Sequence, residues 1–582
     1  MKILGLFGPG PNPSAALLVD GKLAAFVEEE RLNRIKTSPN SLPIQSARQC
    51  LSMAGLSLDD IDGIGYAWDC ENYNRDMPAF FSEQKKIYSN QDEYSRLQDE
   101  LLLNLYHPAR IERVLQLGLG SLSASRKLPK VSYFPHHLCH AASAYYCSGF
   151  DAANILSIDG SGEDTTTLLC AGRGEEIQKV DSFQIPDSLG GFYATFTEFI
   201  GFRPYMDEGK LMGLASYGKY SEALQKKLDK FLSFDRETGA FKLDPNLRYY
   251  GEHHYGSRYT DEFVELFGPP RERSVSALEA PYPDIAFAAQ WRLEQIVIRL
   301  AEQLHKKTGF RKLCLAGGVA MNCVMNGKLA EQDFVDDIYV QPAASDNGSA
   351  LGAALLLARE KGDAVNHRID HMYWGPSYSD SEIEKSLKEA KISYYRSENV
   401  EDETARLLSE GRIIGWFQGA MEVGARALGN RSILANPLLP EMKEKLNLEV
   451  KHRENWRPFC PSMCSEDYFE YIDAEIDSPF MIMAFPVKEK YKEKFPSCVH
   501  VDGTARPQAV DKNHNPRYWN LIQAFKKITG FGIIINTSFN IQGEPVVCRP
   551  VDALRTFGGT GIDYLVMGDF IAKKGGRDGN RT

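Results

Sequence analysis

Short apolar runs that flank glycine-rich turns recur in the first part of the chain. Residues 2–8 form an apolar run that reaches the turn-rich stretch 8–14, and residues 15–20 are apolar again. Much later, residues 155–159 and 165–171 are apolar or β-branched and flank the turn 160–164. Runs of this length around a tight turn predict two β-hairpins, whose tips can offer backbone N–H groups to a phosphate.

Two further glycine turns precede helices. An apolar strand over 313–316 leads into Gly317 and Gly318 and then a helix from about Ala320. The turn 344–348 opens an apolar helix over 349–358, where Asp346 either caps the helix or faces a ligand. Each turn suits an anion at a helix N-terminus, and each equally suits a plain β–α connection. Two hairpins about one lobe apart are what a duplicated ATPase core of the actin, Hsp70 and sugar-kinase type would show, although two unrelated hairpins would give the same local pattern.

A polar, charged stretch over 359–371 separates this part from a second one. Beyond it, the pattern predicts a helix over 379–390, a strand over 392–395, a helix over 401–409 and a strand over 413–417. Such alternation predicts a second α/β domain with its own core. We therefore expect domains at 1–361 and 371–582, and a frayed basic tail over 573–582.

Composition excludes several classes of protein. The chain has 582 residues and a formal net charge of −11, which argues against a protein that grips nucleic acid. No run approaches the ~18 uncharged apolar residues of a membrane helix, and Gly and Pro interrupt the N-terminal stretch before a signal sequence could form. The eleven cysteines show no CxxC pair, which favours a reducing compartment over a disulfide scaffold. We expect a cytoplasmic protein that binds neither membrane nor nucleic acid.

Three of the twelve histidines lie within residues 136–140. On a helix His136 and His140 share one face, as two ligands of one metal must. His137 lies about 100° away. It occupies the place of the glutamate in a metalloprotease HExxH motif, so that class is excluded. Asp159 and Asp346, both on glycine turns, could complete an N/O set suited to Fe(II), Mn(II) or a similar ion. Capping or core histidines are the alternative.

The second part is rich in basic side chains near glycines, prolines and amide or hydroxyl residues. Arginine forks combined with such donors suit an oxyanion such as phosphate. Solvated surface charge is the alternative; it fits Lys443 and Lys445 well, and fits Arg457 poorly because Trp456 and Phe459 flank that residue. The side chains concerned are Arg426, Arg431, Lys451, Arg453, Arg457, Arg506, Arg517 and the stretch 536–540.

Seven motifs in order give the chain a family resemblance. It resembles the ATP-dependent O-carbamoyltransferases of the NodU/CmcH type, which act in antibiotic and nodulation-factor biosynthesis, over nearly its whole length. The motifs are HHLCHAASA from 136, GKLMG from 209, GGVAMN from 317, SDNG from 345, GARALGNRS from 424, WRPF from 456 and NTSFN from 536.

The resemblance implies an α/β protein with two domains in tandem. The first would be a duplicated actin-like (ASKHA) ATPase-type domain, similar to the tRNA threonylcarbamoyl transferase, and the second a YrdC-like domain. The second would turn carbamoyl phosphate and ATP, with Mg²⁺, into carbamoyl adenylate and release phosphate and pyrophosphate. The first would pass the carbamoyl group to a hydroxyl of a small molecule and release AMP. A homodimer is possible.

Matching motif to motif also implies residue roles. His136, His140, Asp159 and Asp346 would hold Fe(II) or a similar divalent transition metal. Lys36 would contact the nucleotide or the carbamoyl group. Carbamoyl phosphate would be held by Arg426, Arg457, Arg506 and Asn536, and ATP by Lys451, Thr537 and Ser538. The adenylate would be held by Asp159, Gly160, Ser161, Gly162, Glu163, Lys210, Gly317, Gly318 and Asn322.

The chain departs from the family pattern where a base for the acceptor is expected. Family members commonly carry histidines just before the position of Ser14 and directly after that of Lys36, where this chain has 11–13 (Pro-Asn-Pro) and Thr37. His137 is then the best remaining group to take the proton.

We expect an acceptor entrance formed by 8–14, 36–40 and 205–208. Its carboxylates, on Asp207, Glu208 and 28–30, would favour a polyhydroxylated or amine-bearing molecule, unless they only pair with Arg31 and Arg34. Two other functions remain open at this point: a tRNA threonylcarbamoyl-type transferase and an actin-like ATPase switch.

Overall fold

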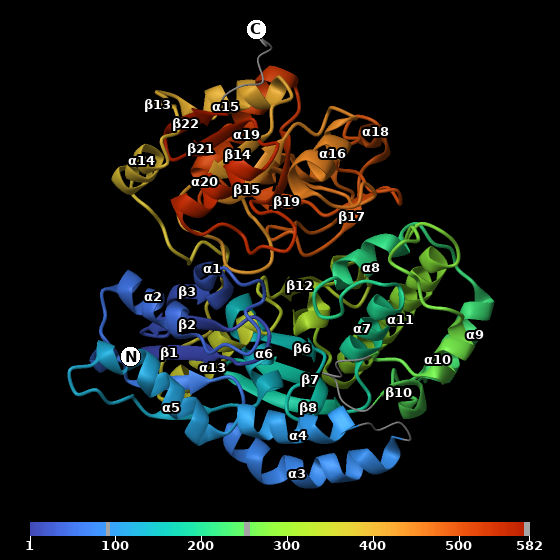
Figure 1. Ribbon diagram of the computed structural model, residues 1–582. Coiled ribbons are helices and arrows are strands. Elements are labelled where there is room, and N and C mark those ends of the chain that lie inside the picture. Colours follow the sequence, from blue (N-terminus) through green and yellow to red (C-terminus); the bar gives the residue numbers. More distant parts are fainter. Residues whose placement is uncertain (89–92, 250–256, 575–582) are drawn as a thin grey trace. The chain divides into compact units, whose positions relative to one another are not determined.

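The computed structural model describes residues 1–88, 93–249 and 257–574 (Figure 1). The chain forms two compact units, Met1–Glu29 with Pro39–Ile369 and Glu30–Ser38 with Asp370–Thr582. The short segment 30–38 thus groups with the second unit, which a single boundary near residue 361 does not anticipate. Of the expected tail at 573–582, residues 575–582 lie outside the described residues.

Two five-stranded sheets in the first unit share one topology. The first sheet has the order β3-β2-β1-β4-β5 and the second has β8-β7-β6-β11-β12. In each, three strands form an antiparallel meander and two more run parallel to the meander's first strand. The predicted hairpins are β1–β2 and β6–β7, so the duplication expected from them is confirmed. The strands are β1 (Lys2–Phe7), β2 (Ser14–Val19), β3 (Lys22–Glu28), β4 (Gly63–Tyr66), β5 (Val131–Tyr133), β6 (Ala152–Ile158), β7 (Thr165–Arg173), β8 (Glu176–Gln184), β11 (Lys312–Ala316) and β12 (Asp337–Val340).

The helix that follows the fifth strand of each repeat packs in the centre of the unit. These helices are α6 (His136–Ser148) and α13 (Asn347–Glu360), which contact each other between the two sheets (Figure 1). Small residues allow the approach, because a Cβ on Gly352 of α13 would lie 1.8 Å from the carbonyl oxygen of Cys139. The starts of both helices are thereby brought to one place.

Other helices surround the two sheets. The expected helix from about Ala320 begins later, at Cys323, because Asn322 caps it and residues 318–321 form a 3₁₀ turn. No helix among the described residues is both long and apolar enough to cross a membrane. The main ones are α2 (Ile44–Ala54), α3 (Cys70–Ile87), α4 (Glu93–Leu105), α5 (Pro108–Leu119), α7 (Leu189–Phe199), α8 (Glu208–Ala215), α9 (Glu222–Phe231), α10 (Asp261–Phe267), α11 (Tyr282–Thr308) and α12 (Cys323–Ala330).

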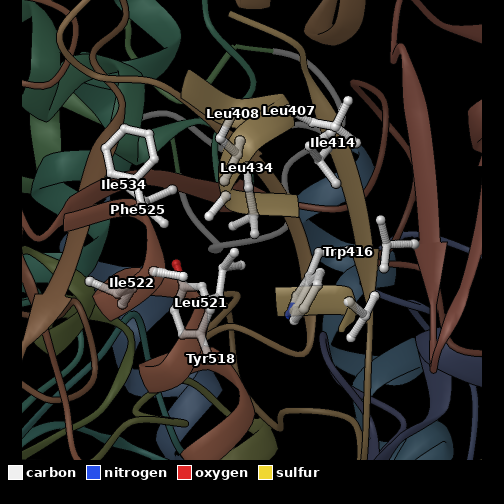
Figure 2. Packing of buried hydrophobic residues seen from close by; sticks show 14 of the residues in the cluster. Leu407, Leu408, Ile414, Trp416, Leu434, Tyr518, Leu521, Ile522, Phe525 and Ile534 are labelled. Atoms are coloured by element: carbon white, nitrogen blue, oxygen red, sulfur yellow. The ribbon is translucent and has the colours of Figure 1, made fainter. Parts of the chain in front are cut away.

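An eight-stranded mixed sheet forms the second unit, in the order β13-β22-β21-β14-β15-β20-β16-β19. Its apolar core gathers Trp416 and Leu434 from the sheet with Leu408 and Tyr518 from two helices (Figure 2). The four elements predicted over 379–417 are present, each within two residues of its expected bounds. The strands are β13 (Tyr394–Arg396), β14 (Ile414–Phe417), β15 (Arg431–Ala435), β16 (Cys460–Cys464), β19 (Gln508–Val510), β20 (Ile533–Ser538), β21 (Tyr564–Met567) and β22 (Phe570–Lys573), and the helices include α14 (Asp380–Glu389), α15 (Val400–Ser409), α17 (Ser465–Tyr471), α19 (Pro516–Thr529) and α20 (Pro550–Gly559).

Candidate functional site

Helix α6 presents two histidines from its first turns. Pro135 precedes the helix, and the carboxylate of Glu163 accepts a hydrogen bond from the backbone N–H of His136 at 3.1 Å. This carboxylate satisfies a helix-terminal donor that would otherwise be left without a partner. The Nε2 atoms of His136 and His140 lie 3.0 Å apart, so the i, i+4 spacing does place both rings on one face.

Asp159 directly follows strand β6 and lies beside these rings. Its Oδ2 lies 3.0 Å from Nε2 of His140 and 3.8 Å from Nε2 of His136. Its Oδ1 accepts a hydrogen bond from the N–H of Gly160, and a Cβ on Gly318 would lie only 2.8 Å from the same oxygen. The glycine turn after β11 is therefore shaped around the carboxylate of Asp159.

Asp346 completes the group from the start of α13. It occupies the N-cap position, yet its side chain makes no capping hydrogen bond. Oδ1 instead lies 3.6 Å from Nε2 of His136 and 3.8 Å from Nε2 of His140. Of the two roles left open by the sequence, the structure favours the one facing a ligand.

These four side chains form the metal cluster: His136, His140, Asp159 and Asp346. Their ligand atoms lie within 4.8 Å of one another. A mixed imidazole and carboxylate set suits a divalent transition metal. Nδ1 of His136 lies 3.2 Å from the carbonyl oxygen of Ala67; a proton shared there leaves Nε2 free to bind a metal. The donor set and its orientation thus fit a metal ion.

The electrostatics of the cluster agree with a cation site. Burial opposes the charge on His136, but the neighbouring carboxylates of Asp159 and Asp346 outweigh burial and raise its pKa to about 10. Burial likewise opposes the charge of Asp159, yet the two imidazoles hold its pKa well below the usual range. The metal cluster therefore stabilises a positive charge at its centre.

His137 lies on a different side of the helix. Burial, followed by the charges of His136 and His140, lowers the pKa of His137 to about 3. Its Nδ1 lies 2.8 Å from Oγ of Ser157, and its Nε2 has no hydrogen-bond partner among the described residues. The ring is therefore neutral, with one nitrogen still available.

The residues expected around an adenylate are only partly brought together. The turn after Asp159 and the glycines Gly317 and Gly318 adjoin the metal cluster, and a Cβ on Gly317 would lie 2.2 Å from the carbonyl oxygen of Ile158. Asn322 is bonded instead to the side chain of Gln290 and caps α12. Lys210 is buried and lies 3.3 Å from Oδ2 of Asp207.

The second unit gathers cations around Lys451. Its ammonium group donates to Oδ1 of Asn540 at 2.9 Å and to Oγ of Ser538 at 3.3 Å. Burial, followed by the charges of Arg453, Arg457 and Lys36, lowers the pKa of Lys451 well below the usual range. A buried ammonium with cations as neighbours favours an anion as ligand.

Two arginines extend this group. Burial and then the charge of Arg457 lower the pKa of Arg453 to about 9, and Arg506 contributes in the same direction. The guanidinium of Arg506 also lies 2.9 Å from Sγ of Cys460. We call Lys451, Arg453, Arg457 and Arg506 the cation cluster. The sequence places Arg453 among the basic candidates, but the family resemblance assigns it no substrate.

Asn536, on strand β20, holds the glycine loop that carries Arg426. Its amide donates to the carbonyl of Ala427 and to side-chain oxygens of Ser462 and Gln508, each at 3.1 Å. Its role in the structure is thus to fix the loop beside Arg426. Thr537 and Ser538 follow on the same strand and are half-buried.

The segment 30–38 places Lys36 in the second unit. Its ammonium lies 3.3 Å from Oε1 of Glu30, and Arg31 donates to the carbonyl of Gly424 at 2.7 Å. Burial would raise the pKa of Glu30, but the charges of Arg31 and Lys36 outweigh it and lower the pKa. From the sequence, Arg31 is expected only to pair with carboxylates, because no local pattern indicates a bond to residue 424.

Comparison with known proteins defines the class. The chain matches the family model for the carbamoyltransferase N-terminus over residues 2–355 and the model for the carbamoyltransferase C-terminus over residues 405–574. It belongs to the carbamoyltransferase family and is a transferase enzyme. The resemblance to O-carbamoyltransferases of the NodU/CmcH type is thereby confirmed.

Individual relatives cover most of the chain. Nodulation protein NolNO of Sinorhizobium fredii is 37% identical over 96% of this chain and 78% of that protein. The uncharacterized protein sll1178 of Synechocystis sp. is 36% identical over 98% of this chain and 96% of its own length. A 3'-hydroxymethylcephem-O-carbamoyltransferase of Amycolatopsis lactamdurans is 30% identical over 62% of this chain and 64% of that enzyme.

Proposed function

We propose that this chain is an ATP-dependent O-carbamoyltransferase with its two chemical steps divided between its units. The second unit would make carbamoyl adenylate from carbamoyl phosphate and Mg²⁺-ATP, and the first would transfer the carbamoyl group to a hydroxyl of a small natural product. One observation carries the proposal. The metal cluster lies in the region that matches the N-terminal family model and suits the transfer step, and the cation cluster lies in the region that matches the C-terminal model and suits adenylate formation. The name of the cephem O-carbamoyltransferase supports oxygen as the accepting atom.

The cation cluster supports the first step. Carbamoyl phosphate and ATP are both anionic, and their repulsion must be offset before they can react. Arg426, Arg457 and Arg506 would hold the phosphate of carbamoyl phosphate, and the unpartnered Oδ1 of Asn536 would accept from its carbamoyl NH2 group. Lys451, Thr537 and Ser538 would hold ATP. A single water molecule cleaves carbamoyl phosphate to carbamate and phosphate, and a carbamate oxygen then attacks the α-phosphorus of ATP and displaces pyrophosphate. Fixed cations orient the two groups and exclude water from a short-lived carbamate.

The metal cluster supports the second step. His136, His140, Asp159 and Asp346 would hold Fe(II) or a similar ion, which when bound supplies a Lewis acid for the carbamoyl carbonyl or the AMP leaving group. The turn 160–163, with Gly317 and Gly318, would support the adenylate. The acceptor hydroxyl then attacks the carbamoyl carbon, AMP leaves, and a proton leaves the hydroxyl.

The acceptor proton needs a group near the metal cluster. His137 is proposed to accept a hydrogen bond from the acceptor hydroxyl through Nε2, because Nδ1 is held by Ser157. Its pKa of about 3 makes it a weak base, so the proton would pass from the hydroxyl to the departing AMP. Lys36 is proposed to act on the anionic substrates of the second unit, because its charge acts on Lys451 there.

The duplicated sheet of the first unit supports an actin-like domain of the ASKHA type, and we propose that the second unit is YrdC-like. The test is to follow both steps separately in the purified chain. Pyrophosphate release that depends on carbamoyl phosphate, followed by AMP release that depends on a hydroxyl acceptor, would support the division. ADP and phosphate as sole products of ATP would count against it.

A further inference from the structure

A pocket in the first unit lies between helix α3 and the turn that follows β6. Aromatic and apolar side chains supply most of its wall, and the turn 161–163 closes one side. Trp68 and Tyr106 stack at 4.1 Å between ring centroids and form a rigid part of this wall. The lining comprises Trp68, Tyr73, Phe80, Phe81, Gln84, Tyr88, Asp99, Leu102, Tyr106, Ser161, Gly162, Glu163, Ile185, Pro186, Arg248 and Tyr249.

Three polar atoms of the lining have no hydrogen-bond partner among the described residues. They are Nε1 of Trp68, Oε1 of Gln84 and Nε of Arg248. Their residues are only 6%, 9% and 4% exposed, respectively. A buried donor or acceptor without a partner is costly, and such atoms are rare enough in folded proteins to need an explanation. Two donors and one acceptor that line one pocket are explained by a polar ligand.

This pocket adjoins the metal cluster. The ring of Trp68 lies 5.2 Å from that of His136 between centroids. In the turn 161–163, a Cβ on Gly162 would lie 2.9 Å from Cδ2 of His137. The turn 161–163 therefore has one side in the pocket and the other against the histidines. A ligand held here lies next to the site proposed for carbamoyl transfer.

The lining selects a chemical class. Aromatic walls suit a ring with apolar faces, whereas the unpartnered N–H groups and amide oxygen suit hydroxyls at the ring's edge. Asp99 is paired with Lys85, and Glu163 accepts hydrogen bonds from the backbone N–H groups of Asp69 and His136, so neither carboxylate needs a cation from the ligand. A saturated ring that carries several hydroxyls, such as a pyranose or a cyclitol, combines C–H faces with an edge that both donates and accepts.

We propose that this pocket is the acceptor site and that the acceptor carries a polyhydroxylated saturated ring. The inference rests on the proposed O-carbamoyl transfer and assigns the acceptor to the α3 side of the metal cluster. None of the residues 8–14, 36–40 and 205–208, where the entrance was expected, lines this pocket. Trp68, Gln84 and Arg248 bind the ring's hydroxyls, and the hydroxyl that reacts faces Ser161 and Gly162.

Binding can be tested without catalysis by saturation-transfer NMR on the full chain. The probes are methyl β-glucopyranoside and myo-inositol, with open-chain sorbitol and planar adenosine for comparison. Trp68→Phe removes the N–H but keeps an aromatic ring, and Gln84→Met removes the acceptor at similar size. Each change should weaken binding of the ring probes about three- to tenfold, as expected for one hydrogen bond. Trp291→Phe, at a ring that packs on Tyr220, is the matched control and should change nothing.

Pyrophosphate release from ATP and carbamoyl phosphate reports separately that each variant is folded and that its second unit is active. Binding of the ring probes that falls in Trp68→Phe and Gln84→Met but persists in Trp291→Phe supports the pocket. Absence of ring-probe binding, equal binding in all variants, or a preference for adenosine would overturn it. If binding of the ring probes depends on Trp68 but no hydroxyl compound is carbamoylated, the result supports the ligand pocket and contradicts the proposed function.

Discussion

Asp346 begins helix α13 but leaves it uncapped, and its Oδ1 lies 3.6 Å from Nε2 of His136 at the start of helix α6. The two helices follow the fifth strands of the two repeats, so these residues stand at equivalent ends of a duplicated fold. The duplication therefore brings a histidine and a carboxylate from distant parts of the chain to one cation site. The side chain of Asp346, which stands at the N-cap, contributes to this site and does not cap its own helix.

Metal binding is the first prediction. The purified chain should hold about one divalent transition metal ion per molecule. His140→Ala removes one of two imidazole ligands and should lower both the metal content, measured by mass spectrometry of the elements, and acceptor carbamoylation. His107→Ala, at an exposed helix start, should keep the metal. Full metal content in His140→Ala would contradict the assignment.

Removal of one arginine from the second unit should stop adenylate formation. Arg457→Ala or Arg426→Ala should abolish pyrophosphate release that depends on carbamoyl phosphate, because a charged anchor at a desolvated anion site contributes about 2–5 kcal/mol. Arg406→Ala, in an exposed pair with Glu410, is the control. His136→Ala should leave pyrophosphate release measurable and block transfer. If His136→Ala instead lost pyrophosphate release and Arg457→Ala kept it, the proposed assignment of the two steps to the two units would be wrong.

Arg31 should act on the anion site through the loop that it holds. Its guanidinium is buried and donates to the carbonyl of Gly424, two residues before Arg426. Arg31→Met removes a charged hydrogen bond worth about 1.5–3 kcal/mol, so the KM for carbamoyl phosphate should rise about tenfold or more while metal content stays constant. Arg48→Met, which loses an exposed bond to the carbonyl of Gly118, should leave this KM unchanged. An unaltered KM in Arg31→Met would show that the loop keeps its shape without Arg31.

Glu208 gives a prediction about pH. Burial raises its pKa from 4.5 to about 7. Folding therefore takes up a proton between these values, so this group's contribution to stability falls as pH rises from 4.5 and is lost above about 7. Glu208→Gln carries no such charge and should exceed the wild-type chain in stability by about 1–3 kcal/mol at pH 8, with little difference at pH 4. Urea midpoints at both pH values measure this, and the exposed change Glu222→Gln should show neither effect. A wild-type chain more stable than Glu208→Gln at pH 8 would contradict the raised pKa.

The sequence predicted much of the fold because its signals were local. The hairpins β1–β2 and β6–β7 have glycine-rich tips between apolar runs, and the helices α14 and α15 have ordinary caps and amphipathic spacing. The start of α12 was wrong by three residues because Asn322, which caps this helix, also bonds with Gln290 from helix α11. Such a contact is set by tertiary packing and leaves no mark in the neighbouring residues.

The metal cluster was predictable for a similar reason. The i, i+4 spacing of the two histidines is visible in the sequence, and both aspartates lie on glycine turns that follow predicted strands. The aromatic pocket could not be anticipated, because Trp68, Gln84 and Arg248 lie in unremarkable local sequence and meet only through packing. The same holds for Arg31, whose bond to Gly424 joins residues almost four hundred positions apart.

The central claim is that carbamoyl transfer to oxygen proceeds through an adenylate. The most direct measurement is the full product balance when the metal-loaded chain is incubated with ATP, carbamoyl phosphate and a cyclic polyhydroxylated acceptor. The account predicts AMP, pyrophosphate and phosphate in equal amounts, together with an acceptor that mass spectrometry and NMR show to carry one carbamoyl group on oxygen. ADP in place of AMP and pyrophosphate, or a carbamoyl group on nitrogen or on tRNA, would contradict it.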